Sequence, residues 1–108
     1  MHGFPCDELI SALQKHIRLG DLDEASLAAR EMFETDEQLC LQLWDRLTTI
    51  ACSDITDRSF LAPVIVETLR TQSLRQDRRS GDGWLYVAHA VRYLCQAPKD
   101  RTTDELCM

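Results

Sequence analysis

The sequence lacks the motifs that most enzymes and cofactor-binding proteins show. Only four of its 108 residues are glycine, and it contains neither Gly-x-x-x-x-Gly-Lys-[Ser/Thr] nor Gly-x-Gly-x-x-Gly, the loops that hold nucleotide phosphates. His2, His16 and His89 lie far apart, and none has a second ligand at the short helical spacing common in metal sites. We therefore expect no catalytic activity, no cofactor and no metal, and we interpret His89 as a helix-flank or core residue.

Cysteine is present, but not in the patterns that indicate a disulfide framework or a zinc site. The five cysteines are odd in number and include no Cys-x-x-Cys pair, which argues against both a set of disulfides and a structural zinc site. Cys40, Cys52 and Cys95 fall in apolar helical patterns. We interpret these three as small buried hydrophobic residues.

Long hydrophobic runs and an excess of positive charge are also missing. No apolar run approaches the roughly 20 residues of a membrane span, and the N-terminal residues lack the basic and hydrophobic regions of a signal peptide. Twelve Lys and Arg stand against eighteen Asp and Glu, giving a net charge of −6 that repels nucleic acid and anionic membranes. We expect a cytosolic protein without a membrane partner, in which any contact with nucleic acid is local.

What the sequence does contain is helical periodicity. Apolar residues recur at intervals of three and four in five stretches, and no stretch alternates as a strand would. A chain of this length forms one domain with one core. We predict an all-α, compact five-helix bundle over 7–98, with an N-terminal extension at 1–6 and a tail at 99–108. The expected helices cover 7–18, 22–34, about 35–55, about 61–75, and a stretch from a cap at Ser80 or Asp82 to just before Pro98.

The stretch 35–55 is the predicted centre of the bundle. Thr35 with Gln38 has the form of a capping box, which marks a helix start. A helix that is apolar on most of its circumference must be covered from more than one side. Its predicted stripe, widened by Leu39 and Leu41, consists of Cys40, Leu43, Trp44, Leu47, Ile50 and Ala51.

The other helix ends have recognisable residues. Gly20 suits the left-handed position that ends a helix, and Asp21 with Glu24 is a second predicted capping box. The fourth helix has a cap at Asp57 or Ser59 and contains Pro63, which predicts either a start near Leu61 or a kink. Its predicted buried stripe is Leu61, Val64, Ile65, Leu69 and Leu74; that of the fifth helix is Trp84, Val87, Ala88, Val91, Leu94 and Cys95.

Three groups of polar or aromatic residues are candidates for contacts with other molecules. Trp44, Trp84 and Tyr93 are candidates for a subunit interface, because aromatic residues are enriched there. Carboxylates near the end of the second helix could bind a cation, but helix ends and loops place them there in any case, so we interpret Glu31, Glu34, Asp36 and Glu37 as solvated surface. The basic cluster that could meet phosphates or an acidic partner consists of Arg70, Arg75, Arg78 and Arg79.

Three separated segments together resemble one protein family. They are Leu9-Ile10-Ser11-Ala12-Leu13-Gln14-Lys15-His16-Ile17-Arg18; Arg46 followed by Ile50-Ala51-Cys52-Ser53-Asp54-Ile55; and Ala90-Val91-Arg92-Tyr93-Leu94-Cys95-Gln96-Ala97-Pro98-Lys99. Their order and spacing are similar to those of the C-terminal helical domain of replication-associated AAA+ ATPases of the RarA/MgsA type, related to the Werner-helicase-interacting protein. Ser53, Thr56 and Asp100 depart from that pattern.

The resemblance implies a collar-like fold akin to that of clamp loaders and a role in holding subunits together, commonly as tetramers. The polar residues that match the family pattern are Lys15, Arg18, Arg46, Asp54 and Lys99. For Arg46 with Asp54 we predict a structural ion pair that ties helices together. The ATPase and lid domains of the family are not in this sequence, so we expect neither ATP hydrolysis nor the DNA-dependent activity.

Two hypotheses for function follow from the sequence. The first is a non-catalytic oligomerisation and protein-interaction module that assembles with itself, as a homo-oligomer of up to tetramer size, or with a related AAA+ ATPase of DNA replication or repair. The alternative is a DNA-binding accessory protein that uses the cluster at 70–79.

Overall fold

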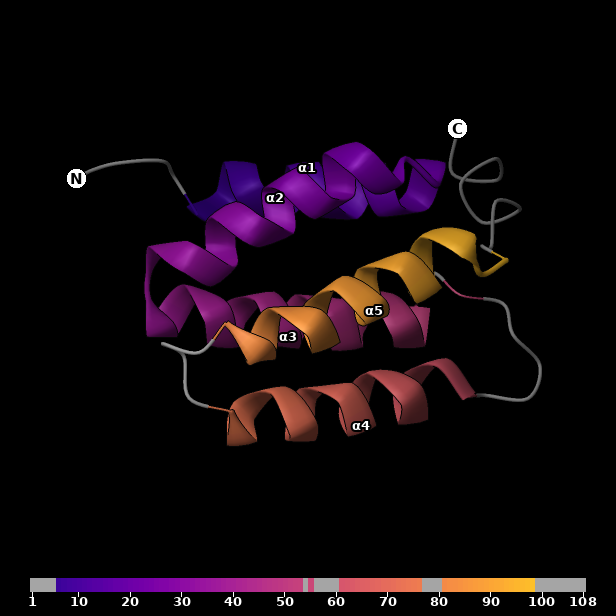
Figure 1. The fold of residues 1–108 in the computed structure, drawn as a ribbon. Coiled ribbons are helices and arrows are strands. Elements are labelled where there is room, and N and C mark those ends of the chain that lie inside the picture. The colour runs from indigo at the N-terminus through magenta and orange to yellow at the C-terminus, as the bar shows by residue number, and fades with distance from the viewer. Residues whose placement is uncertain (1–5, 54, 56–60, 77–80, 99–108) are drawn as a thin grey trace.

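The computed structural model describes residues 6–53, 55, 61–76 and 81–98, and these residues form a bundle of helices (Figure 1). The prediction of an all-α five-helix bundle is confirmed. No helix in these ranges is both long enough and apolar enough to cross a lipid bilayer. The five elements are α1 (Cys6–Leu19), α2 (Leu22–Thr35), α3 (Glu37–Ser53), α4 (Leu61–Arg75) and α5 (Asp82–Gln96).

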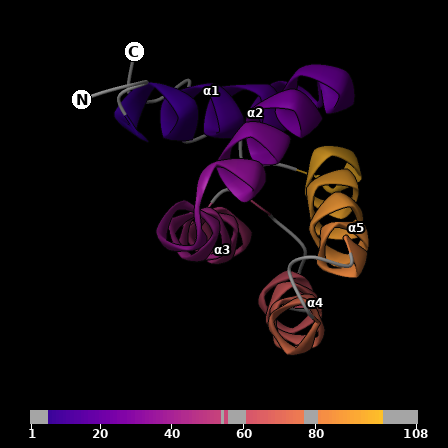
Figure 2. The ribbon, with the colours of Figure 1, turned by 60° about the vertical axis from the view of Figure 1, so that its left-hand side comes forward.

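The helices are not equally central. α1 and α2 form a tight antiparallel hairpin that packs on α3 and α5, and α3 contacts all four other helices. In the two views of the ribbon, α4 lies at the edge of the bundle farthest from the hairpin (Figures 1 and 2). Among the described residues α4 contacts only α3 and α5. One long side of α4 is therefore left without a helical neighbour.

The turn between α1 and α2 confirms the predicted end and start signals. Gly20 has φ +75°, the left-handed conformation that favours glycine, and its N–H donates to the carbonyl of Ile17 at 3.0 Å. A side-chain oxygen of Asp21 accepts a hydrogen bond from the backbone N–H of Glu24 at 3.4 Å. The two helices can therefore turn back on each other within two residues.

The start of α3 lies one residue later than the predicted capping box placed it. Thr35 is the last residue of α2, where its hydroxyl donates to the carbonyl of Glu31 at 2.6 Å. Asp36 is the capping residue instead, and its carboxylate accepts from the N–H of Leu39 at 2.7 Å. A carboxylate suits this position because it also meets the positive end of the helix dipole. The prediction for Thr35 was wrong, and α3 ends at Ser53 rather than near 55.

The predicted stripe of α3 is buried, with Leu41 as the exception. Trp44 is fully buried, and the other members of the predicted stripe are buried with it. Leu41 was expected in the stripe but is 40% exposed, and Cys52 was expected to be buried but is exposed. Like α3, α5 contacts all four other helices, so these two helices share the centre of the bundle. The largest fully buried side chains, drawn from all five helices, are Trp44, Leu13, Ile17, Met32, Leu43, Leu47, Ile50, Leu94, Val66, Val87 and Val91.

The ends of α4 are those predicted, but its buried face is not. The helix starts at Leu61, with Pro63 in its first turn, where no intrahelical donor is needed. The predicted buried stripe was wrong: its members Leu61, Val64 and Leu74 are exposed and Ile65 and Leu69 are half-buried. The residues that α4 buries are Ala62, Val66 and Ser73. The predicted caps Asp57 and Ser59 lie outside the described residues.

Small residues explain this choice of face. The Ser73 hydroxyl donates to the carbonyl of Gly83 at 2.9 Å, so α4 and α5 approach closely at this point. A Cβ on Gly83 would lie 3.3 Å from Ser73 Oγ and 3.5 Å from Phe33 Cζ. Bulky leucines could not occupy this contact, so α4 turns its small residues towards α5. Gly81, with φ +79°, is the N-cap of α5, which corrects the prediction of Asp82; Ser80 lies outside the described ranges.

Candidate interaction surface

The outer face of α4 carries three large aliphatic side chains that are exposed to solvent. We use this name for the exposed residues of α4, which are Leu61, Val64, Glu67, Thr68, Thr71, Leu74 and Arg75. Leu61, Val64 and Leu74 are 49%, 58% and 47% exposed, respectively, and Glu67 and Arg75 are the charged members of the face. Exposed leucines are ordinary when they occur singly, whereas several on one helix side indicate a contact surface.

A small apolar cavity continues this surface at one end of the bundle. Leu74 of α4 and Leu41 of α3 both line a hollow of about 110 Å³, whose other walls include Phe33 and Cys40. The hollow lies where the end of α4 meets the starts of α3 and α5. It is large enough for part of one aliphatic or aromatic side chain, and too small for a cofactor, since ligand pockets usually measure about 300 Å³ or more.

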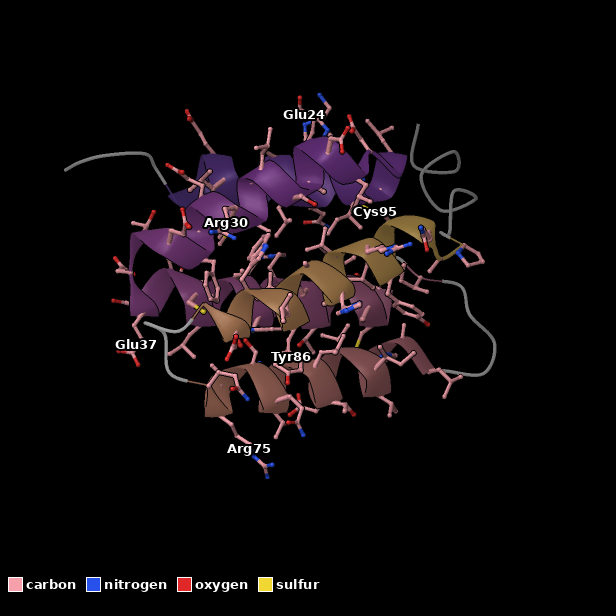
Figure 3. All side chains as sticks on the ribbon, viewed as in Figure 1. Glu24, Arg30, Glu37, Arg75, Tyr86 and Cys95 are labelled. Atoms are coloured by element: carbon pink, nitrogen blue, oxygen red, sulfur yellow. The ribbon has the colours of Figure 1, made fainter. Side chains whose placement is uncertain are left out.

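The structure describes two members of the predicted basic cluster, Arg70 and Arg75. Arg70 Nη1 forms an ion pair with Asp45 Oδ1 of α3 at 3.0 Å, so this guanidinium already has a counter-charge. Arg75 is exposed and points away from the bundle (Figure 3). Arg78 and Arg79 lie outside the described residues. Within the described part of the cluster, only Arg75 is without a carboxylate partner, which gives the DNA-binding alternative little support.

A second hollow, between α1 and α3, was not anticipated from the sequence. We call it the Arg46 cleft; its volume is about 260 Å³ and it is lined by Ile10, Gln42, Asp45, Arg46 and Thr49. Gln42, Arg46 and Thr49 follow each other at four and three residues, so their polar groups share one side of α3. This spacing was visible in the sequence, but the apolar stripe on the opposite side of the helix hid its importance.

Arg46 is half-buried in this cleft. No carboxylate among the described residues lies within ion-pairing distance of its guanidinium, because Asp45 pairs with Arg70 instead. The predicted partner Asp54 lies outside the described residues. The cleft therefore presents the guanidinium of Arg46 and the amide of Gln42 beside the apolar side chain of Ile10, and its wall also includes the carboxylate of Asp45, which pairs with Arg70. A guanidinium and an amide beside an apolar wall suit a carboxylate on an apolar stem.

The three aromatic candidates differ in accessibility. Trp44 has no exposed surface, so it packs the core and cannot contact another molecule in this conformation. Trp84 is half-buried, with the Phe33 ring centroid 5.6 Å away and Arg30 Cζ 4.8 Å from its own ring centroid. Arg30 also binds Glu34, at 2.7 Å from Nε to Oε2. Trp84 and Tyr93, both half-buried on α5, are the two that reach the surface.

The remaining predicted polar residues form no metal-binding group in the described ranges. Lys15 is exposed and Arg18 half-buried on α1, and Lys99 lies outside these ranges. His16 Nδ1 lies 3.6 Å from Asp21 Oδ2, and His89 is exposed. Glu31, Glu34, Asp36 and Glu37 are all exposed, as expected for solvated surface, and no cluster of three metal-binding side chains occurs in these parts of the chain.

No protein-family model matches the sequence, and neither does any curated protein. The resemblance to the C-terminal domain of RarA/MgsA-type ATPases thus stays a prediction based on three segments. In the structure, the first of these segments lies on α1, residues 46 and 50–53 of the second lie on α3, and residues 90–96 of the third lie on α5.

Proposed function

We propose that this protein is a non-catalytic oligomerisation and protein-interaction module of the cytosol. It assembles with itself as a homo-oligomer, or with an AAA+ ATPase of the RarA/MgsA type in DNA replication or repair. The observation that supports this proposal best is the outer face of α4, where three large aliphatic side chains are about half exposed on one helix. The family resemblance supports it independently.

Burial of the apolar side chains on this face does not by itself suffice for stable association. Full burial of an aliphatic side chain contributes about 1.5–3 kcal/mol, so covering half of Leu61, Val64 and Leu74 contributes a few kcal/mol. Association costs about 4 kcal/mol or more in lost translational and rotational freedom. The α4 face therefore needs further contacts beside it, which Leu41 and the adjoining hollow can supply.

The charge on α4 also favours contact at this face. α4 contains Glu67, Arg70 and Arg75, for a net charge of +1, whereas the whole chain has −6. Two acidic molecules repel each other least where each is locally neutral or positive. Negative charge therefore does not oppose contact between α4 and another acidic molecule.

Sedimentation velocity tests this proposal over a protein concentration from about 10 μM to about 1 mM, the range of weak association. We expect the wild type to shift to larger species as concentration rises, and Val64→Lys to reduce that shift. Leu85→Lys is the matched control, since Leu85 on α5 is also 58% exposed but lies on another helix. A wild type that stays monomeric throughout would overturn self-assembly, and an equal effect of both variants would overturn the role of α4.

A further inference from the structure

The side chains of the Arg46 cleft are arranged to receive an acid. Arg46 offers a planar guanidinium whose nitrogens match the two oxygens of a carboxylate. The amide of Gln42 can donate a further hydrogen bond, whereas the Thr49 hydroxyl already donates to the carbonyl of Asp45 at 3.0 Å, and Ile10 of α1 supplies an apolar wall. Asp45 also lines the cleft and pairs with Arg70, so Asp45, Arg46 and Arg70 together carry a net charge of +1 on a chain whose net charge is −6.

The outward side of α2 has the complementary chemistry. α2 contains four acidic residues and one basic residue, a net charge of −3. Asp23, Leu27 and Glu31 follow at intervals of four, so they form one row on the side opposite the buried alanines of α2. We call this row the α2 acidic row.

Leu27 is 65% exposed, the largest value for any large hydrophobic side chain among the described residues. Asp23 and Glu31 form no ion pair within those residues, whereas Glu34 is bound by Arg30. The neighbouring acid Glu24 likewise points outward from α2 (Figure 3). An apolar side chain between two unengaged carboxylates thus stands out from the bundle.

We propose that the Arg46 cleft of one copy binds the α2 acidic row of a second copy. Leu27 packs against Ile10, and a carboxylate of Asp23 or Glu31 accepts hydrogen bonds from Arg46 and Gln42. This inference rests on the self-assembly proposed above and names a second contact for it, separate from the outer face of α4. Opposite charges on the two surfaces favour this pairing over contact between two α2 helices, which would repel each other.

The two surfaces are different, so each copy can bind one neighbour through its cleft and another through its row. The cleft is lined by residues of α1 and α3, whereas the row is on α2, away from the residues that α2 buries. A contact of this kind joins copies head to tail and leads to a ring or an open chain. One helix side set in a shallow cleft falls among contacts of less than about 1,200 Å², which are typical of weak association.

Charge reversal tests the pairing directly in the full chain. Arg46→Glu places a carboxylate in the cleft, and we expect it to weaken association on the order of 30-fold or more. Asp23→Lys with Glu31→Lys is expected to do the same from the other side, although it brings the net charge from −6 to −2 and so lowers general repulsion. Arg92→Glu, an exposed residue on α5, is the control with the same charge change as Arg46→Glu.

Mixing the two variants provides the decisive measurement by sedimentation velocity. Each variant alone is expected to associate more weakly than the wild type, since only the contact through the outer face of α4 remains. An equimolar mixture is expected to recover association, because every cleft then meets a row of opposite charge. Circular dichroism checks that both variants fold. If the mixture associates no more strongly than either variant alone while the wild type associates, the pairing is wrong and self-assembly stands. If Val64→Lys abolishes association and Arg46→Glu does not weaken it, the pairing of cleft and row is also wrong, and self-assembly through α4 stands. A wild type that never associates overturns both proposals.

Discussion

α3 and α4 are similar in length and in apolar content, yet the bundle uses them differently. α3 buries seven of its 17 residues, including Trp44, whereas α4 buries three of its 15, none larger than valine. The reason is position: α3 contacts every other helix, and α4 contacts two. The comparison shows that the number of apolar residues in a helix does not determine how many are buried, because neighbouring helices decide which of them are covered.

The largest expected effect comes from truncating the central residue of α3. Trp44→Ala should reduce the free energy of unfolding by about 3–5 kcal/mol, since it leaves a large cavity in a fully packed site. Val64→Ala on the outer face of α4 should change it by no more than about 0.5 kcal/mol. Urea denaturation followed by circular dichroism measures both. Similar losses for the two variants would remove the contrast between the helices.

The next effect concerns the start of α3. Asp36→Ala removes the carboxylate that accepts from the N–H of Leu39, and we expect a loss of about 1 kcal/mol. Thr35→Ala, which removes only a hydroxyl that bonds back within α2, should cost less. The same denaturation series ranks the two. A larger loss for Thr35→Ala would restore the capping box that the sequence predicted.

A comparable or smaller effect is expected at the contact that fixes α4. Ser73→Ala removes the buried hydrogen bond from its hydroxyl to the carbonyl of Gly83 and should cost about 0.5–1.5 kcal/mol. Thr71→Ala is the matched control on the exposed side of α4, where the hydroxyl bonds only within its own helix. Equal losses would mean that the close approach of α4 to α5 does not depend on Ser73.

The smallest effect belongs to the ion pair between the two helices. A double-mutant cycle with Asp45→Asn and Arg70→Gln should give a coupling energy of about 0.2–1 kcal/mol, because the Asp45 side chain is 68% exposed. The coupling should fall further at 1 M salt, where surface charges are screened. A coupling that persists at high salt would show that the pair is shielded from solvent and ties α4 more firmly than its exposure indicates.

The regular parts of this fold could be predicted from the sequence because local physics determines them. Gly20 and Asp21 define a turn whatever surrounds it, and Leu61 and Arg75 bound α4 because turn-forming residues follow. The buried face of α4 could not be found in this way. Its leucines form a plausible stripe, but the close contact between Ser73 and Gly83 requires small residues, and only the packed structure shows that contact.

The candidate surfaces were less predictable for the same reason. The basic cluster was evident from spacing, but the sequence did not indicate that Asp45, 25 residues earlier, neutralises Arg70. The Arg46 cleft depends on the position of Ile10 in a helix far away along the chain. Contacts between distant segments thus decided which polar residues stay available.

The two indole rings of this protein differ in their surroundings in a way that makes each a separate optical probe. Trp44 is sealed from solvent, and its Nε1 has no hydrogen-bond partner among the described residues, so its fluorescence should be blue-shifted and hard to quench. Trp84 lies at the surface beneath the guanidinium of Arg30, where a quencher or another molecule can reach it. Tryptophan fluorescence of the unlabelled protein therefore distinguishes binding at the outside of α2 and α5, reported by Trp84, from loosening of the core, reported by Trp44.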